Sequence, residues 1–391
     1  MISWKAPLAL AGARWAWSRA RRRYGSAPTP EPARGRNLEL LAWGAAGAVI
    51  GVGASALSER RRSGLMSGKV VLITGGSRGL GLQLAREFGA SGASVVICAR
   101  GQENLDRAVA ELTGRGVDAH GVVCDVTDPE QVETLLDEAE QRFGRLDVLV
   151  NSAGTMLVGP QDALTDEHFR QAMDIMFWGP FHLSRAAVDR LRATRGSIVN
   201  ITSIGAYLSV PHMLPYSTAK HAWAALSEGM AAETAGTGVR VTTVVPGLMR
   251  TGSHRGVLFR GDPEREYAWF ALAAGLPLLS VSVERAARHI VHATARRKGF
   301  LVITPTARLG LVARGIAPGL TQEAMRLVGW LLPDTPGQVE ERLGSEAGDS
   351  RLGRVVNTVA VLNERAGRQM NQRSRAEEQR EDRRTGERSS E

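Results

Sequence analysis

The chain has 391 residues, 43% of them hydrophobic and 23% charged, which suits one large globular domain with appendages or two smaller domains. Its net charge is +9, but residues 1–66 carry eleven basic and three acidic side chains, so the remainder is nearly neutral. That distribution argues against a basic groove for nucleic acid. The two cysteines, Cys98 and Cys124, lie outside any CxxC or Cys/His cluster, so we predict neither a metal site nor a disulfide framework.

The N-terminal part of the chain has the composition of a membrane anchor. Residues 1–37 are basic and contain three tryptophans, as in an interfacial amphipathic helix or a targeting peptide. Residues 38–58 are predicted to form a transmembrane helix, because 40–57 carry no charge and three arginines follow at 60–62. A weakly apolar helix lying on the membrane surface is the alternative. Met66 is a second candidate start site, directly before the folded domain.

Residues 66–305 alternate between short β-branched runs and longer stretches with helical spacing and charged faces. This alternation predicts a single α/β domain with a doubly wound parallel sheet, the Rossmann fold, and helices on both faces of the sheet. The expected helices include 80–89, 102–114 and 128–143. The expected strands are 70–74, 94–99, 119–124, 146–151, 196–201, 239–245 and 300–304.

The pattern weakens after the last of these strands. Residues 306–370 form a C-terminal extension, in which 309–332 are moderately apolar but interrupted by glycine and proline. This stretch either covers the end of the sheet or touches a membrane surface. Residues 371–391 are almost wholly polar and charged, which predicts a disordered tail.

A glycine-rich loop follows the first predicted strand and precedes the first predicted helix. Its glycines permit a tight turn and a close approach of the backbone to a pyrophosphate, and the helix N-terminus offers unpaired N–H groups to the anion. A loop in this context is a much stronger signal than an isolated glycine motif. We therefore predict that it binds a dinucleotide through Gly75, Ser77, Arg78, Gly79, Leu80 and Gly81.

The spacing of these glycines, Gly-x-x-x-Gly-x-Gly, resembles that of the short-chain dehydrogenase/reductase family, and the resemblance extends over residues 69–304. Arg100 ends the second predicted strand, where an acidic residue would bind the ribose hydroxyl of NAD. Arg78 and Arg100 together suit the 2′-phosphate of NADP through charge and bidentate geometry. In this family the pairing implies preference for NADP(H).

Further motifs of the family follow in chain order. Asp125, after the third strand, resembles the family's adenine contact. The segment from Asn151 to Gly154 resembles the Asn-Asn-Ala-Gly motif beside the cofactor, with serine as its second residue. A Pro-Gly motif follows the sixth strand. The resemblance implies cofactor contacts for Asp125, Asn151, Ala153, Gly154, Pro246, Gly247 and Thr251.

Ser203, Tyr216 and Lys220 are the predicted catalytic group. Tyr216 and Lys220 are four residues apart, on one face of a helix, and Ser203 follows the fifth strand. Free tyrosine has a pKa of about 10, and a nearby ammonium would favour its phenolate. By resemblance to the family, Tyr216 transfers a proton at the substrate oxygen, Ser203 polarises that oxygen, and Lys220 also holds the ribose of the cofactor.

One position departs from the family pattern. Met176 stands where the family has an asparagine that helps to hold a water on a proton relay from the lysine. A thioether is only a weak hydrogen-bond acceptor. The relay is therefore expected to be rerouted or slower, and a catalytically weak NADP(H)-binding sensor or scaffold protein is the alternative function.

The expected substrate is a small carbonyl or alcohol compound. The segments 204–214 and 248–282 are rich in apolar residues, which suggests a lipophilic substrate, although these side chains could equally be packing. The predicted partners are this substrate, membrane lipid and a second copy of the chain, with no nucleic acid. The protein is expected at a membrane, single-pass or peripheral, with its catalytic domain in the cytoplasm.

Overall fold

The computed structural model describes residues 64–275, 280–335, 337–359 and 369–371. The basic segment 1–37, the predicted transmembrane helix 38–58 and residues 372–391 of the predicted disordered tail lie outside these residues, whereas Asn371, the first residue of that tail, is hydrogen-bonded to Ser77. Within the described part of the chain, no helix has both the length and the apolar character needed to cross a bilayer. The predictions for the N-terminal segments and the tail therefore stay predictions.

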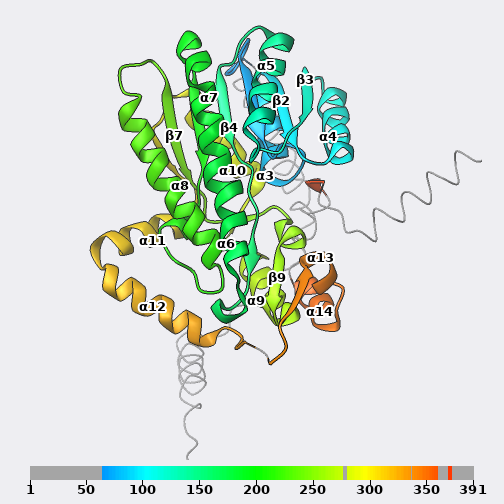
Figure 1. Cartoon of the computed structure of the whole chain (residues 1–391), viewed down its shortest axis with the longest axis vertical. Coiled ribbons are helices and arrows are strands. Elements are labelled where there is room, and N and C mark those ends of the chain that lie inside the picture. Colours follow the sequence, from blue (N-terminus) through cyan, green and yellow to red (C-terminus); the bar gives the residue numbers. More distant parts are fainter. Residues whose placement is uncertain (1–63, 276–279, 336, 360–368, 372–391) are drawn as a thin grey trace, which may run out of the picture. The chain divides into compact units, whose positions relative to one another are not determined.

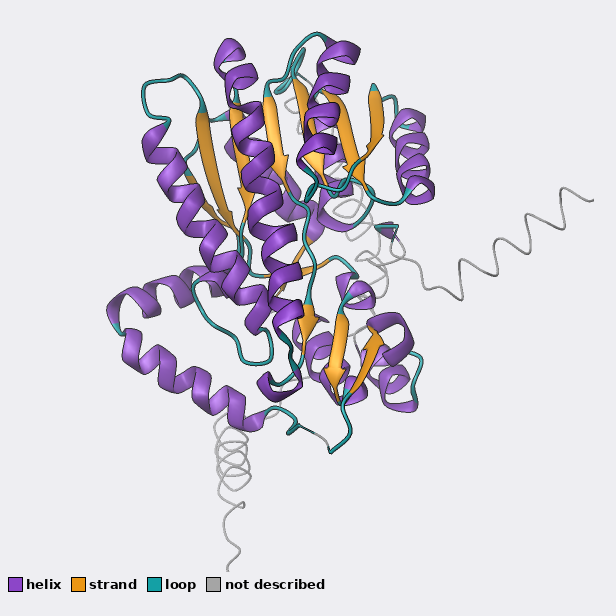
Figure 2. Ribbon diagram, viewed as in Figure 1, coloured by secondary structure: helices purple, strands orange, loops and turns teal. Residues whose placement is uncertain are grey.

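A seven-stranded parallel sheet forms the centre of the fold, in the order β11-β7-β6-β4-β1-β2-β3 (Figures 1 and 2). The strand order reverses at β1: β2 and β3 are added on one side of β1, and β4, β6, β7 and β11 on the other. This order confirms the doubly wound sheet. The strands are β1 (Val70–Thr74), β2 (Ser94–Ala99), β3 (Ala119–Val123), β4 (Val148–Asn151), β6 (Ser197–Ile201), β7 (Arg240–Val245) and β11 (Phe300–Val302).

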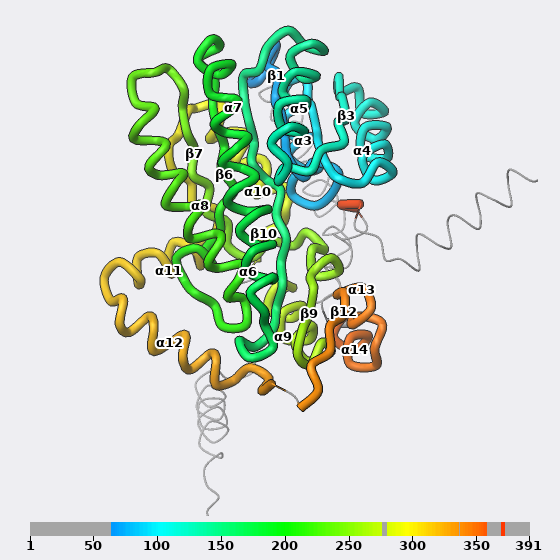
Figure 3. The backbone as a smooth tube through the Cα atoms, in the orientation of Figure 1, coloured from blue at the N-terminus to red at the C-terminus, as the bar shows by residue number. Residues whose placement is uncertain are grey.

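Helices cover both faces of this sheet because successive strand residues point to opposite sides. Val71 and Ile73 of β1 belong to the core beneath one set of helices, and Leu72 between them belongs to the core beneath the other. The first set is α3 (Gly79–Ala90), α4 (Gln102–Gly114) and α10 (Val283–Ala295); the second is α5 (Pro129–Phe143), α7 (Gly179–Thr194) and α8 (Leu214–Glu233) (Figure 3).

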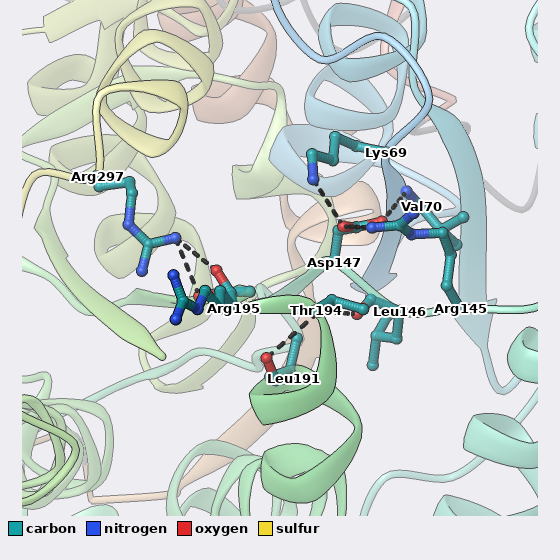
Figure 4. A network of polar contacts seen from close by, with 10 residues as sticks. Lys69, Val70, Arg145, Leu146, Asp147, Leu191, Thr194, Arg195 and Arg297 are labelled. Carbon is teal, nitrogen blue, oxygen red and sulfur yellow. Dashed lines mark hydrogen bonds and ion pairs between the residues drawn. The ribbon is translucent and has the colours of Figure 1, made fainter. Parts of the chain in front are cut away.

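Ion pairs around the buried carboxylate of Asp147 lie at the amino edge of the sheet, opposite the glycine loop (Figure 4). Asp147, 2% exposed, accepts hydrogen bonds from Lys69 Nζ at 2.9 Å, from Arg145 Nη2 at 2.7 Å and from the Val70 amide at 3.0 Å. Burial alone would raise the pKa of Asp147, but these donors hold it below its ordinary value. The carboxylate thus ties the start of β1 to the start of β4.

A second, smaller lobe lies beyond the carboxyl edge of the sheet. Its three-stranded sheet has the order β12-β9-β5, with β5 (Leu157–Val158), β9 (Leu258–Gly261) and β12 (Glu340–Leu343). Helices α9 (Pro263–Gly275) and α13 (Gly344–Ala347) pack against this sheet, and α14 (Arg351–Val359) packs against α9 (Figure 1). The C-terminal extension therefore contributes residues 340–359 to the lobe that contains the predicted substrate segment. A short parallel pair, β8 (Leu248–Arg250) with β10 (Ser280–Ser282), links the lobe to the main domain.

The apolar stretch after the last strand forms two helices, α11 (Pro305–Ile316) and α12 (Pro318–Leu331). Their inner side approaches the segment after β6, since a methyl group added at Gly310 would meet Leu208 at 2.8 Å. Their outer side exposes large apolar residues, with Ile316 and Trp330 each 80% exposed. Helices α11 and α12 therefore cover the segment after β6 with one side and expose an apolar surface on the other.

The remaining short elements connect these layers. They are α6 (Asp166–Met173), the π-helix η2 (Asp174–Trp178) and the 3₁₀ turns η1 (Gln161–Ala163), η3 (Ile204–Ala206) and η4 (Ser253–Gly256).

Candidate active site

A cavity of about 470 Å³ opens at the carboxyl edge of the sheet, where the strand order reverses. Ligands bind at this place in open α/β folds. Every predicted site residue except Asn151 lines the cavity: Gly75, Ser77, Arg78, Gly79, Leu80, Gly81, Arg100, Asp125, Ala153, Gly154, Ser203, Tyr216, Lys220, Pro246, Gly247 and Thr251. The cavity also contacts residues that sequence reasoning did not assign, among them Asn104, Met156 and Ile175.

The glycine loop between β1 and α3 needs its glycines for two separate reasons. Gly75 has φ +64°, a left-handed conformation that costs glycine nothing. Gly81 lies so close to the loop that an added Cβ would be 2.2 Å from the Gly75 carbonyl oxygen. The chain therefore turns sharply and directs the N-terminus of α3 toward the cavity, which is the geometry of an anion site.

The end of β1 is also tied to the motif that follows β4. Thr74 Oγ1 accepts hydrogen bonds from the amides of Ser152 at 3.0 Å and Ala153 at 2.9 Å. An added Cβ on Gly75 would meet the Ala153 Cα at 3.0 Å. Both loops therefore pack backbone against backbone, which holds the two halves of the cavity floor in a defined geometry.

Two arginines stand at the end of the cavity formed by the glycine loop and β2. Arg100 follows β2, and its Nη1 lies 3.9 Å from Asp125 Oδ2, with 68% of the Arg100 side chain exposed. Arg78 is the N-cap of α3, and an added Cβ on Gly256 would approach its guanidinium to 3.8 Å. The arrangement provides positive charge at a solvent-accessible end of the cavity.

Asn151 differs from its prediction, because its side chain points away from the main cavity. Its Nδ2 donates to Ser184 Oγ and to Asn200 Oδ1, both at 2.9 Å. Asn200 in turn donates to Ser227 Oγ on α8 at 2.9 Å. The residue is 3% exposed. Asn151 thus joins β4, α7, β6 and α8 in a buried polar network, and it borders only a small pocket behind Lys220.

Ser203, Tyr216 and Lys220 meet in the cavity. Ser203 caps η3, where its Oγ accepts from the Gly205 amide at 3.0 Å, and Tyr216 is in the first turn of α8. Burial raises the pKa of the Tyr216 phenol, and a hydrogen bond with Ser203 opposes that rise. Lys220 donates to the Ile201 carbonyl at 2.9 Å, and burial lowers its pKa to about 8.

Met176 lies beside Lys220, as the sequence pattern predicts. It is 1% exposed and packs with Ala172 and Ala219. An added Cβ on Gly154 would lie 3.8 Å from Met176 Sδ and 4.0 Å from Lys220 Nζ. Met176 belongs to the π-helix η2, and such bulges are frequent at functional sites. The thioether therefore occupies an apolar pocket behind the lysine.

Most of the apolar side chains predicted near the substrate are packed inside the second lobe. Phe259, Tyr267 and Phe270 are at most 5% exposed, and their rings make edge-on contacts with one another. Met249 and Val257 of the segment 248–282 do line the cavity. The packing interpretation therefore holds for the central aromatic residues. The alternation of side-chain direction along β9 could have indicated that Phe259 is buried, since its two neighbours in the strand are less buried.

The second lobe is fastened to the segment before α8 by a buried polar group. Glu266 of α9 is fully buried; its Oε1 lies 2.8 Å from His212 Nδ1, and its Oε2 accepts from Trp269 Nε1 at 2.7 Å. His212 has φ +63° and lies four residues before Tyr216. Sequence reasoning missed this contact, because the partners are 54 residues apart.

The model of the short chain dehydrogenase family matches residues 69–258. A granaticin polyketide synthase protein of Streptomyces violaceoruber, whose name describes a ketoacyl reductase, is 38% identical over 185 residues, which cover 46% of this chain and 68% of that protein. The L-fucose dehydrogenase of Bos taurus is 37% identical over 187 residues, 47% of this chain and 67% of that enzyme.

Two further comparisons extend over more of the chain. The 11-beta-hydroxysteroid dehydrogenase 1A of Arabidopsis thaliana is 32% identical over 268 residues, covering 67% of this chain and 75% of that enzyme. Among solved structures, a short-chain type dehydrogenase/reductase from Mycobacterium marinum has a TM-score of 0.53 and 28% identity, covering 61% of this chain and 94% of that one.

Proposed function

The chain belongs to the short-chain dehydrogenase family, and we propose that it is an NADP(H)-dependent oxidoreductase that interconverts a carbonyl and an alcohol. The observation that carries the proposal is the meeting of Ser203, Tyr216 and Lys220 in the cavity that begins at the glycine loop. An ordinary Tyr-x-x-x-Lys pair on a helix would have no reason to share a cavity with the N-terminus of α3.

The residues of the cavity fit a dinucleotide. Its volume is within the range of ligand pockets, about 300–1,000 Å³. The approach of Gly81 to the Gly75 carbonyl leaves no room for a side chain, as a backbone cradle for a pyrophosphate requires. The Pro246–Gly247 turn and Thr251 line the same cavity, as does Lys220. They would hold the nicotinamide end.

The nicotinamide coenzyme, when bound, supplies or accepts the hydride. In reduction, Tyr216 donates its hydroxyl proton to the substrate oxygen, and in oxidation it takes that proton back. Ser203 donates a hydrogen bond to the same oxygen and thereby polarises the carbonyl. The Lys220 ammonium favours the phenolate that Tyr216 becomes, because opposite charges at short range stabilise each other.

The two arginines support NADP(H) over NAD(H). Arg78 and Arg100 both line the end of the cavity that contains Asp125. A 2′-phosphate there would meet two guanidiniums, each of which can bind phosphate oxygens in a bidentate manner. The unphosphorylated ribose of NAD(H) would gain nothing from this charge.

A lipophilic substrate is supported by the wall of the cavity and by the proposed location of the protein. Met156, Ile175, Met249 and Val257 line the cavity together with Tyr216. An enzyme attached to a membrane would receive lipophilic substrates from it directly. A clear preference for small polar substrates such as sugars would contradict this part of the proposal.

Attachment to a membrane is supported by the basic and uncharged segments before Met66. A cytoplasmic location of the catalytic domain stays an expectation, because arginines flank the uncharged segment on both sides. The exposed Ile316 and Trp330 of α11 and α12 add an apolar surface suited to contact with lipid.

Assembly into a homo-oligomer remains an expectation from the family resemblance.

The test is a titration of the purified full-length chain with NADPH and NADH, followed by turnover with a panel of hydrophobic ketones and alcohols. Tyr216→Phe should lower kcat by at least about 100-fold, as expected for loss of the proton donor, and leave the dissociation constant for NADPH within about threefold.

Arg78→Ala combined with Arg100→Ala should weaken NADPH binding by about 10- to 100-fold and NADH binding much less. A folded chain that binds neither nucleotide would overturn the proposal.

A catalytically weak nucleotide sensor is the second candidate, favoured by Met176 beside Lys220. It predicts tight NADPH binding without turnover on any member of the panel. Met176→Asn distinguishes the two functions, since it should raise turnover only if the wild-type chain is an enzyme whose proton relay is slow.

A further inference from the structure

Three residues near the C-terminus contact the glycine loop and α3 from nearly 300 positions away in the sequence: Met370 and Asn371 bond to the loop, and Gln369 bonds to Arg86 of α3. We name this segment the C-terminal clasp; it is the short red piece beside α4 in Figure 1. Met370 is 1% exposed, so the clasp is packed into the domain and not merely resting on it. The clasp lies beyond the residues matched by the family model, which end at 258.

The clasp bonds to both sides of the loop. The Met370 carbonyl accepts from the Gly79 amide at 3.0 Å, and Asn371 Nδ2 donates to the Ser77 carbonyl at 3.0 Å. The same Nδ2 lies 3.4 Å from the carbonyl oxygen of Asn104, in the first turn of α4. Asn371 therefore bridges the glycine loop and the N-terminal turn of α4 through one side-chain amide.

Arg86 fixes the other end of the clasp. Its Nη2 donates to the Gln369 carbonyl at 2.8 Å, and its Nη1 lies 3.3 Å from Met370 Sδ. The same guanidinium makes a bidentate pair with Glu111 of α4, at 2.8 and 2.7 Å. The clasp is thus anchored on the seam between α3 and α4, where a paired arginine already holds the two helices together.

The clasp contacts residues that line the cavity but does not itself fill the cavity. Ser77, Gly79 and Asn104 all line the cavity, whereas the three clasp residues are not among those that line it. The clasp therefore contacts the loop on the side that faces away from the cavity. Asn371 bonds to the carbonyls of Ser77 and Asn104. Ser77 directly precedes Arg78, and Asn104 lies four residues after Arg100.

We propose that the C-terminal clasp is a positioning element of the coenzyme site, in which Asn371 sets the spacing of Arg78 and Arg100 and so favours NADPH over NADH. This inference rests on the proposed function. Arg78 and Arg100 lie on two different connections, β1–α3 and β2–α4. Asn371 bonds to Ser77 in the first connection and to Asn104 in the first turn of α4, directly after the second. A phosphate gripped by two guanidiniums requires their separation to be maintained, since bidentate bonds are sensitive to geometry.

The chosen variant is Asn371→Gly in the full-length chain. Asn371 has φ +55°, so glycine removes the amide without placing a Cβ in a strained conformation. We expect the dissociation constant for NADPH to rise about five- to tenfold, as for the loss of one or two hydrogen bonds, and that for NADH to change less than about twofold. Asn371→Asp, which cannot donate and adds negative charge beside the phosphate, should have a larger effect in the same direction.

Two controls match these variants. Gln369→Ala retains the main-chain carbonyl that Arg86 uses, so both constants should stay as in the wild type. Removal of residues 380–391 keeps the clasp and should also have no effect, whereas removal of 369–391 should reproduce the loss of selectivity. Thermal unfolding without nucleotide is measured for every variant.

The outcomes separate the clasp from the proposed function. Failure of the wild-type chain to bind either nucleotide overturns the proposed function itself. NADPH selectivity that is unchanged in Asn371→Gly overturns only the clasp. Equal weakening of both nucleotides with a lowered melting temperature also overturns it, because a merely structural contact would act in that way.

Discussion

Lys220 is the residue whose surroundings most clearly set the chemistry of the site. The residue is 6% exposed, and its ammonium donates a hydrogen bond to the Ile201 carbonyl. Because burial disfavours the charged form, its pKa falls from 10.5 to about 8. The lysine is therefore charged at neutral pH but loses its proton within the working range of many enzymes.

This titration predicts a pH dependence for carbonyl reduction. Below about pH 8 the Lys220 ammonium supports the phenolate that forms when Tyr216 gives up its proton, and above that pH the support is lost. We expect kcat/KM for reduction to fall as pH rises through about 8. In Lys220→Arg the guanidinium stays charged, so the residual activity should not show that fall. A flat wild-type profile from pH 7 to 9.5 would contradict the assignment.

At the scale of elements, the positions of helices and strands depend on a few buried polar groups that link distant segments. Glu266 joins α9 to the segment before α8, and Asp147 joins β1 to β4. The first fastens the second lobe, and the second lies at the amino edge of the main sheet. Each can be tested by a substitution that removes the carboxylate.

Glu266→Ala should lower the free energy of unfolding by about 2–4 kcal/mol, because it leaves His212 and the Trp269 indole without their buried acceptor. Denaturant unfolding measures the change. Arg265→Ala, one residue earlier on the exposed face of α9, is the control and should stay within about 0.5 kcal/mol. Equal effects of the two substitutions would show that the buried contact does not hold α9.

Asp147→Asn should destabilise the fold by about 1–3 kcal/mol at neutral pH, since hydrogen bonds to a charged acceptor are lost. The folded pKa of Asp147 lies below its unfolded value, so its contribution is complete above about pH 4 and is lost as pH falls through the folded pKa. The stabilities of wild type and variant should therefore converge in acid. Asp118→Asn, an exposed ion-pair partner of Arg142, should cost less than about 1 kcal/mol.

At the scale of the whole molecule, the main unit begins at Arg61, and the proposed anchor precedes it. The main unit carries its own exposed apolar surface on α11 and α12, including Leu309, Ile316, Leu320 and Trp330. Two sources of membrane affinity are therefore proposed, and they are separable by deletion.

Vesicle flotation provides the measurement. The full-length chain should float with vesicles that contain anionic lipid, and a chain lacking residues 1–63 should lose most of that binding while keeping NADPH affinity. Any binding that persists should disappear when Ile316→Asp and Trp330→Asp are combined. Absence of flotation by the full-length chain would remove membrane lipid from the proposed partners.

Local sequence was sufficient wherever the signal lay within a few neighbouring residues. The limits of β1, β2 and α4 agree with their predicted ranges, because β-branched runs and helical spacing are local properties. The glycine loop and the Tyr216–Lys220 pair were recognisable for the same reason. Parallel strands then bring all their carboxyl ends to one edge, so the meeting of Ser203 with that pair followed from the fold class.

Tertiary packing decided what depends on contacts between distant segments. Asn151 is turned toward Ser184 and Asn200 by partners 33 and 49 residues away, and Phe259 and Tyr267 pack together because β12 and α13 close the lobe around them. The approach of Asn371 to Ser77 spans 294 positions. Hydrophobic burial and hydrogen bonding act between whatever surfaces the chain brings together, and no short stretch of sequence specifies both partners.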